Sequence, residues 1–266
     1  MSLRQISKLK QVNCLRKYND IYLKNAYSQQ HQSFKKVNDE TLYEGHRPIN
    51  TFQKGVLAVG SAIAGITNPY RSDMVASLGE TLFPEQALRN IQLLMLNSES
   101  GRMILKDKPI IDGNLLNIKE LLSFPKDSLG FAYAHFMDTN QLSSDARDPV
   151  HYISNTELAY IMKRYRQIHD FVHVILGMSV SVPDEVIVKW FECAHFGLPM
   201  NMVSAIFGPL ATSSEEREVI KKYMIWAFNN GYNSKPFMNV YFEKELETNI
   251  DSLKQRLNIT NAPIFD

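Results

Sequence analysis

The stretch "NTELAYIMKRYRQIHDFVHVILGM", residues 155–178, decides the fold of this chain. It begins with an asparagine suited to capping a helix, places Glu157 in the first turn and contains no glycine or proline before Gly177. At about 100° per residue, its apolar side chains fall within one narrow arc. The arc comprises Leu158, Met162, Tyr165, Val172 and Leu176. The stretch therefore predicts one long helix that turns this face towards a core.

Two histidines, His169 and His173, lie on the same arc, and Asp170 lies at its edge. Burying a charged or unpartnered imidazole costs free energy, so both rings need partners. The polar side chains outside the arc are expected to face solvent; they are Lys163, Arg166 and Gln167. The pattern thus concentrates titratable groups on the buried face of the helix.

Helical patterns continue through the rest of the chain. Apolar side chains at helical spacing occur in residues 85–109, where a polar break at 97–101 divides two runs. Further helices are expected at residues 112–125, 128–142, 213–231 and 240–259, and a loop is expected at 143–154. The sequence shows no strand pattern of useful length and no internal repeat. We therefore predict an all-α fold, a single helical domain over residues 45–266 with a metal site between two helices.

The basic charge of the chain is concentrated at its start. The 266 residues carry a formal net charge of +1, yet residues 1–36 contain eight lysines or arginines against one acid, Asp20. Apolar residues recur there at every third position from Leu3 to Leu15. This acid-poor, amphipathic pattern predicts a mitochondrial transit peptide in residues 1–40; the alternative is a disordered basic N-terminus that stays on the mature protein. Two cysteines, Cys14 and Cys193, make a disulfide framework unexpected.

Two uncharged stretches, residues 55–67 and 193–214, bear on membrane association. The first has 13 residues, short of the roughly 20 needed to span a bilayer, and glycines and prolines interrupt the second. No transmembrane helix is therefore expected. Buried core is the expectation for both stretches. The alternatives are the walls of a channel for a long lipid, or a patch that docks on a membrane surface.

His169 and His173 are spaced as a helical half-site for a metal ion. Side chains four residues apart on a helix have Cβ atoms about 5–6 Å apart, so two ring nitrogens can reach one ion. The alternative is a pair of hydrogen-bonded core histidines. Glu185 offers a third ligand, because a helix reversal at residues 177–183 would bring it back near His173. Glu185 also has an alternative, a surface ion pair with Lys189.

The segment "HDFVH", followed by eleven residues and then Glu185, resembles the H-D-x-x-H-x(11)-E signature of the mitochondrial ubiquinone biosynthesis protein 4 family. The stretches "NPYRSDMVASLGE", "IVKWFE" and "GLPM" are also similar to segments of that family, and the similarity covers roughly residues 48–262. The resemblance implies four zinc ligands: His169, Asp170, His173 and Glu185.

The resemblance also implies a function. Family members are zinc-dependent lyases that remove the carboxyl group from ring carbon one of a polyprenylated 4-hydroxy-3-methoxybenzoate. The implied setting is peripheral, on the matrix side of the mitochondrial inner membrane. The implied partners are the polyprenyl hydroxybenzoate lipid, the membrane surface and the other coenzyme Q biosynthesis proteins of a multisubunit complex, with no nucleic acid. Residues 55–67 and 196–210 would then line a channel for the polyprenyl tail.

Three other functions fit some of the same residues. A non-catalytic polyprenyl-lipid-binding scaffold that organises the complex would use the metal for structure. A metal-dependent phosphohydrolase of the HD type would explain His169 and Asp170 but not Glu185. Two histidines with carboxylates also suit non-haem iron, which would permit an oxidative decarboxylation; zinc has no redox chemistry to support one.

Overall fold

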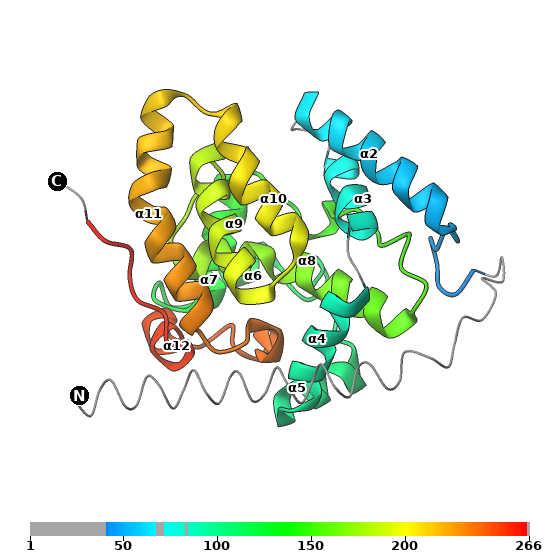
Figure 1. The fold of residues 1–266 in the computed structure, drawn as a ribbon. Coiled ribbons are helices and arrows are strands. Elements are labelled where there is room, and N and C mark those ends of the chain that lie inside the picture. The colour runs from blue at the N-terminus through cyan, green and yellow to red at the C-terminus, as the bar shows by residue number, and fades with distance from the viewer. Residues whose placement is uncertain (1–40, 68–71, 83–84, 265–266) are drawn as a thin grey trace, which may run out of the picture. The chain divides into compact units, whose positions relative to one another are not determined.

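Helices make up nearly all of the regular structure (Figure 1). The computed structural model describes residues 41–67, 72–82 and 85–264. Within these residues no β-strand forms, and a bridge of strand type between Ser128 and Asn249 stands isolated. The described residues belong to one compact unit that begins at Glu40. The predicted all-α fold is confirmed, and the transit-peptide prediction for residues 1–40 lies outside the described residues.

Most of the predicted helices form, but the one expected at residues 112–125 is reduced to the four residues 118–121. The α-helices are α2 (Thr51–Thr67), α3 (Ser72–Leu82), α4 (Glu85–Leu96), α5 (Glu99–Asp107), α6 (Ile118–Leu121), α7 (Leu129–Thr139), α8 (Thr156–Leu176), α9 (Val182–Phe196), α10 (Pro199–Phe207), α11 (Ser214–Asn233) and α12 (Ile250–Leu257). Short 3-10 helices are η1 (Ser144–Ala146), η2 (Gly208–Ala211), η3 (Phe237–Asn239) and η4 (Phe242–Lys244). The polar break at 97–101 separates α4 from α5, as predicted.

Helix α8 is the central element, and both of its ends are set by the sequence. The Asn155 side chain accepts hydrogen bonds from the backbone N–H groups of Glu157 and Leu158, each at 3.0 Å. Gly177 ends the helix with a φ of 71°, a left-handed conformation that glycine adopts at little cost. All five apolar residues of the predicted arc are buried. The helix predicted from residues 155–178 is therefore confirmed.

The prediction that Arg166 and Gln167 face solvent is wrong, although Lys163 is exposed. Gln167 is buried and donates to the carbonyl of Ile111 at 3.0 Å. Arg166 donates to carbonyl oxygens from two segments and to Glu80 of α3, which lies 2.8 Å away. The segments before α6 and before α8 cover this face, so α8 is buried nearly all round.

Helices α10 and α11 both pack against α9, which lies beside α8 (Figure 1). The backbones of α9 and α11 approach closely at Gly231 of α11, where an added Cβ would lie 2.2 Å from the carbonyl oxygen of Phe191 in α9. A side chain at this position would push the two helices apart. Glycine therefore sets the distance between α9 and α11.

The C-terminal part is less helical than its sequence pattern predicts. One helix was expected over residues 240–259, but the structure forms η4 and, after a turn, the eight-residue α12. Asn249 divides them, because its side chain caps α12 by accepting from the N–H of Ser252 at 2.9 Å. Val240 and Phe242 are buried in the core, and their contacts hold residues 240–244 against it.

The uncharged stretches are more exposed than predicted. Val56 and Val59 of α2 are 58% and 62% exposed, and Ile206 and Phe207 of α10 are 52% and 56% exposed. The expectation that both stretches form buried core is therefore wrong for these faces, although Asn201 and Ala205 of α10 are buried. No helix in the described part of the chain is long and apolar enough to cross a membrane, as predicted.

Candidate metal centre

The structure brings together three of the four predicted ligands. His169 and His173 lie one turn apart on α8, and Glu185 lies in the first turn of α9. The two Nε2 atoms are 3.2 Å apart. Glu185 places Oε2 2.9 Å from Nε2 of His173 and Oε1 3.4 Å from Nε2 of His169. These ligand atoms lie within 4.8 Å of one another, a spacing that could hold a metal ion.

A tight connection between α8 and α9 positions Glu185. Ser181 caps α9 by accepting from the N–H of Asp184 at 3.3 Å, and Pro183 occupies the first turn. The Asp184 carboxylate in turn accepts hydrogen bonds from the N–H and the hydroxyl of Ser179. This local network makes α9 start where its first turn faces the histidines.

In each histidine ring, the partner of Nδ1 determines whether Nε2 is free to bind a metal ion. Nδ1 of His173 lies 3.0 Å from the carbonyl oxygen of Ser179, which can only accept, so Nδ1 carries the proton. Nδ1 of His169 lies 2.8 Å from Oε1 of Glu192 and donates in the same way. In the neutral rings, both Nε2 lone pairs therefore face each other and Glu185. Three electron-rich atoms at such short range repel one another unless a proton on His169 Nε2 or a metal ion lies between them, so this arrangement fits a metal site.

The electrostatics of the cluster also favour a cation. Burial and Lys189 act against protonation of His169, but Glu192 and Glu185 outweigh them and raise its pKa to about 9. Burial acts to raise the pKa of Glu185, whereas Lys189 and then His169 hold it well below the usual range. A metal ion would compete with the proton that His169 otherwise holds. The Glu185 side chain is 40% exposed, so the cluster opens to solvent on that side.

The structure does not bring Asp170, the fourth predicted ligand, into the cluster. Its carboxylate forms an ion pair with Arg147, which lies in the segment before α8. The Arg147 side chain is 24% exposed. Burial and then the Asp170 charge raise the pKa of Tyr133 above its usual range, which places the carboxylate towards α7. Asp170 therefore pairs with Arg147 of another segment instead of joining the cluster. Its role as a metal ligand stays a prediction.

Sequence reasoning missed Glu192, whose side chain is fully buried behind His169. The signal was the spacing in α9: Glu185, Lys189 and Glu192 are separated by four and then three residues and share one helix face. Lys189 lies 3.3 Å from Glu185 Oε1 and 2.8 Å from Glu192 Oε2. The Glu185–Lys189 ion pair considered as an alternative is therefore present together with the histidine contacts.

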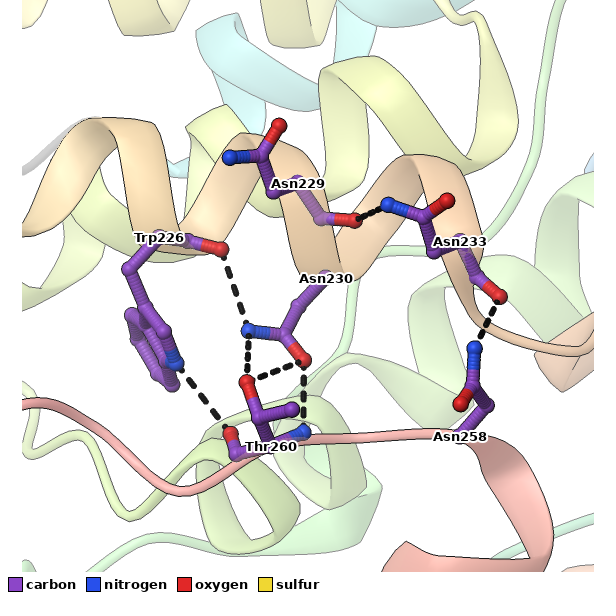
Figure 2. A pocket seen from close by; sticks show the side chains of 6 residues that line it. All are labelled: Trp226, Asn229, Asn230, Asn233, Asn258 and Thr260. Carbon is purple, nitrogen blue, oxygen red and sulfur yellow. Dashed lines mark hydrogen bonds between the residues drawn. The ribbon is translucent and has the colours of Figure 1, made fainter. Parts of the chain in front are cut away.

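A polar pocket of about 370 Å³ lies elsewhere, between α11 and the segment that follows α12 (Figure 2). It is lined by Trp226, Asn229, Asn230, Asn233, Asn258 and Thr260. Figure 2 shows hydrogen bonds between most of these polar groups. The Asn230 side chain accepts from the backbone N–H of Thr260 and donates to its hydroxyl. Trp226 donates to the Thr260 carbonyl at 3.1 Å. The pocket thus fastens the C-terminal segment to α11, and we assign it no ligand.

Comparison with known proteins identifies relatives over most of the chain. The model of the family described as "Coenzyme Q (ubiquinone) biosynthesis protein Coq4" matches residues 43–263. The mitochondrial ubiquinone biosynthesis protein COQ4 homologues of Bos taurus and Homo sapiens are 41% and 39% identical, each over 84% of this chain and 84% of the relative. The mitochondrial coq4 protein of Schizosaccharomyces japonicus is 37% identical over 83% of this chain and 93% of its own length.

A solved structure supports the fold independently. The crystal structure of a candidate ubiquinone biosynthesis protein from Nostoc punctiforme matches with a TM-score of 0.63, and covers 78% of this chain and 97% of that one. Because the sequence identity is 15%, this match supports the helical fold and nothing about function. The family assignment rests on the sequence matches, and by these the chain belongs to the coenzyme Q (ubiquinone) biosynthesis protein Coq4 family.

Proposed function

We propose that this protein is a zinc-dependent carbon–carbon lyase of coenzyme Q biosynthesis. Its substrate would be a polyprenylated 4-hydroxy-3-methoxybenzoate, from which it removes the carboxyl group on ring carbon one. The observation that carries the proposal is the convergence of His169, His173 and Glu185 on one point, with both Nε2 lone pairs turned inward. Membership of the Coq4 family supports a substrate that belongs to ubiquinone biosynthesis.

The donor set suits zinc. Two imidazole nitrogens and one carboxylate are a common ligand set of catalytic zinc sites, which keep one position open for water or substrate. When bound, zinc would supply a Lewis acid that stabilises negative charge on a substrate oxygen. His169 and His173 would hold it through Nε2, and Glu185 through its carboxylate at the solvent-exposed side.

Lys189 supplies a fixed positive charge beside these ligands. Burial acts to lower its pKa, but Glu192 foremost raises it above the usual range, so Lys189 keeps its proton. A retained ammonium group can attract the carboxylate of an incoming substrate but is a poor proton donor. The reaction replaces the bond from the ring carbon to the carboxylate with a C–H bond and releases carbon dioxide. We therefore assign the proton donor to a group other than Lys189.

We place the activity at the matrix face of the mitochondrial inner membrane, within the complex of coenzyme Q biosynthesis proteins. The relatives named above carry "mitochondrial" in their names, which supports the compartment. The exposed apolar side chains of α10, Met202, Ile206 and Phe207, give the protein a surface suited to a lipid or a membrane.

The same apolar surface favours a second function. In that alternative the protein is a non-catalytic scaffold that binds polyprenyl lipid and organises other enzymes, and the metal serves structure. The two functions differ in what a metal-site variant loses. An enzyme loses turnover while its fold and lipid binding persist, whereas a scaffold loses its fold or its partners.

The deciding experiment measures decarboxylated phenol formed by the purified, zinc-loaded chain from a short-tailed polyprenyl 4-hydroxy-3-methoxybenzoate. We expect product from the wild type and roughly 100-fold less from Glu185→Gln, because the variant loses a charged ligand. Glu218→Gln is the control, since Glu218 is exposed and pairs with Lys221 on α11, and it should match the wild type. A wild type that binds zinc yet forms no product would reject the lyase and favour the scaffold.

A further inference from the structure

Glu192 is a charged side chain buried without solvent access, next to the metal cluster but outside the family signature. Its Oε1 lies 2.8 Å from Nδ1 of His169, and its Oε2 accepts from Lys189 at 2.8 Å. Burying a carboxylate is costly unless its oxygens are fully hydrogen-bonded. The fold therefore maintains this charge with a dedicated set of donors, one of which belongs to a metal ligand.

A chain of polar groups holds Glu192 from the other side. The Tyr165 hydroxyl lies 3.0 Å from Oε2 of Glu192 and 2.8 Å from the side-chain amide of Asn201 in α10. A hydroxyl has one hydrogen to donate, and in the described part of the chain the buried Nδ2 of Asn201 has no partner. If the amide oxygen and nitrogen of Asn201 exchange places, Tyr165 accepts from Asn201 and keeps its one hydrogen for Glu192. Asn201 then donates to Tyr165, and Tyr165 donates to Glu192.

These contacts give Glu192 three convergent donors: the ring N–H of His169, the ammonium of Lys189 and the hydroxyl of Tyr165. The donors come from both α8 and α9, so the carboxylate sits between the helices that carry the ligands. A carboxylate held in this way fixes both the tautomer and the ring orientation of a metal-binding histidine.

We propose that Glu192 is a positioning residue that presents Nε2 of His169 to the metal, and that Tyr165 and Asn201 hold Glu192 in place for that task. The inference rests on the metal site of the proposed function. The competing explanation is structural: Glu192 neutralises Lys189 in the core and has no effect on the metal.

The double variant Glu192→Met/Lys189→Met separates the two explanations. It removes one negative and one positive charge, so the net charge near the metal is unchanged, and two unbranched apolar side chains fill similar volumes. If Glu192 only neutralises Lys189, the double variant binds zinc no more weakly than the wild type, because losing Lys189 only releases Glu185 from its ion pair. If Glu192 positions His169, we expect zinc binding about 10–100-fold weaker, measured by competition with a chromophoric chelator. The absorption spectrum of the cobalt-loaded protein should also change, because it reports ligand geometry.

The control is Arg164→Met/Glu243→Met, which removes another buried ion pair that uses a residue of α8. Its zinc affinity should equal that of the wild type, whatever it does to stability. If the first double variant does not fold, Glu192→Gln replaces it. Glutamine offers one acceptor oxygen to three donors, so His169 competes for it and zinc affinity should fall by about tenfold.

The outcomes for this inference and for the proposed function can be told apart. Zinc affinity no weaker than that of the wild type in the folded Glu192 variants would overturn the positioning role and leave the lyase standing. Weakened zinc binding in those variants, with a wild type that binds zinc but does not decarboxylate, would support the positioning role and reject the lyase. A wild type that binds no zinc would overturn both.

Discussion

Two partly buried histidines, His169 and His195, show that the protonation state of a side chain depends on its partners. His169 faces carboxylates, which raise its pKa to about 9. His195 of α9 accepts at Nε2 from the backbone N–H of Phe237 at 2.9 Å, and its Nδ1 lies 3.0 Å from the carbonyl of Gly231. Burial lowers the pKa of His195 to about 4, although Gly231 and Glu192 oppose the shift. His195 is therefore a neutral structural residue, since a proton on Nε2 would break the bond from Phe237.

This difference predicts how stability depends on pH. In the unfolded chain His195 takes up a proton near pH 6.5, but in the folded protein it does so only near pH 4, so stability falls as pH drops through this window. Between pH 7.5 and pH 5 the loss from His195 should be roughly 2 kcal/mol. Urea denaturation with chelator present should show a smaller loss over this range in His195→Gln. Parallel pH profiles of the two proteins would contradict the assignment.

At the scale of elements, the spacing of helices α9 and α11 is set by one residue. Gly231 lets the backbone of α11 approach the carbonyl of Phe191, and the ring of Phe191 stacks on His195 with centroids 5.2 Å apart. Since α9 also carries Glu185 and Glu192, a shift of this helix moves the metal cluster relative to α8. Helix packing and site geometry are therefore coupled through α9.

Gly231→Ala tests this coupling. The new Cβ would lie 2.2 Å from the Phe191 carbonyl oxygen, so the helices must separate, and we expect a loss of about 3 kcal/mol in the free energy of unfolding. Gly55→Ala in α2 is the matched control, because no atom lies within 4 Å of its added Cβ. Alanine there should stabilise helix α2 by roughly 0.5–1 kcal/mol. Equal unfolding midpoints for the two variants would show that α11 does not depend on the close approach.

At the scale of the whole molecule, the candidate metal ligands join α8, the central helix, to α9 and through it to α10 and α11. The cluster exists only when these helices are packed. A ligand that binds only the folded state stabilises it by mass action. Metal binding should therefore raise the stability of the entire helical domain.

Removal of zinc provides the test. At free zinc 100 times the dissociation constant, the stabilisation should be about 2.7 kcal/mol, and chelator should remove it. Thermal denaturation with and without chelator measures this loss as a lower Tm. Glu185→Gln should respond less, because one ligand is missing. A wild type that binds one zinc ion per chain and keeps its Tm after the zinc is stripped would contradict the prediction.

The sequence predicted those parts of the site that depend on local periodicity. The i, i+4 spacing on α8 placed His169 and His173 on one face, and Pro183 marked the helix that carries Glu185. It did not predict the pairing of Asp170 with Arg147 or the support of His169 by Glu192. Those partners lie 23 residues apart in each case, and no helical period relates them.

The sequence by itself determined the all-α fold, the long helix α8 with its Asn155 and Gly177 ends, and the placement of three metal-ligand candidates. It did so because helix caps and the 3.6-residue period are local properties of the chain. The tertiary structure alone decided which faces are covered. It buried Gln167, left Phe207 exposed and assigned each carboxylate its partner, because burial and electrostatic pairing depend on which segments meet in space.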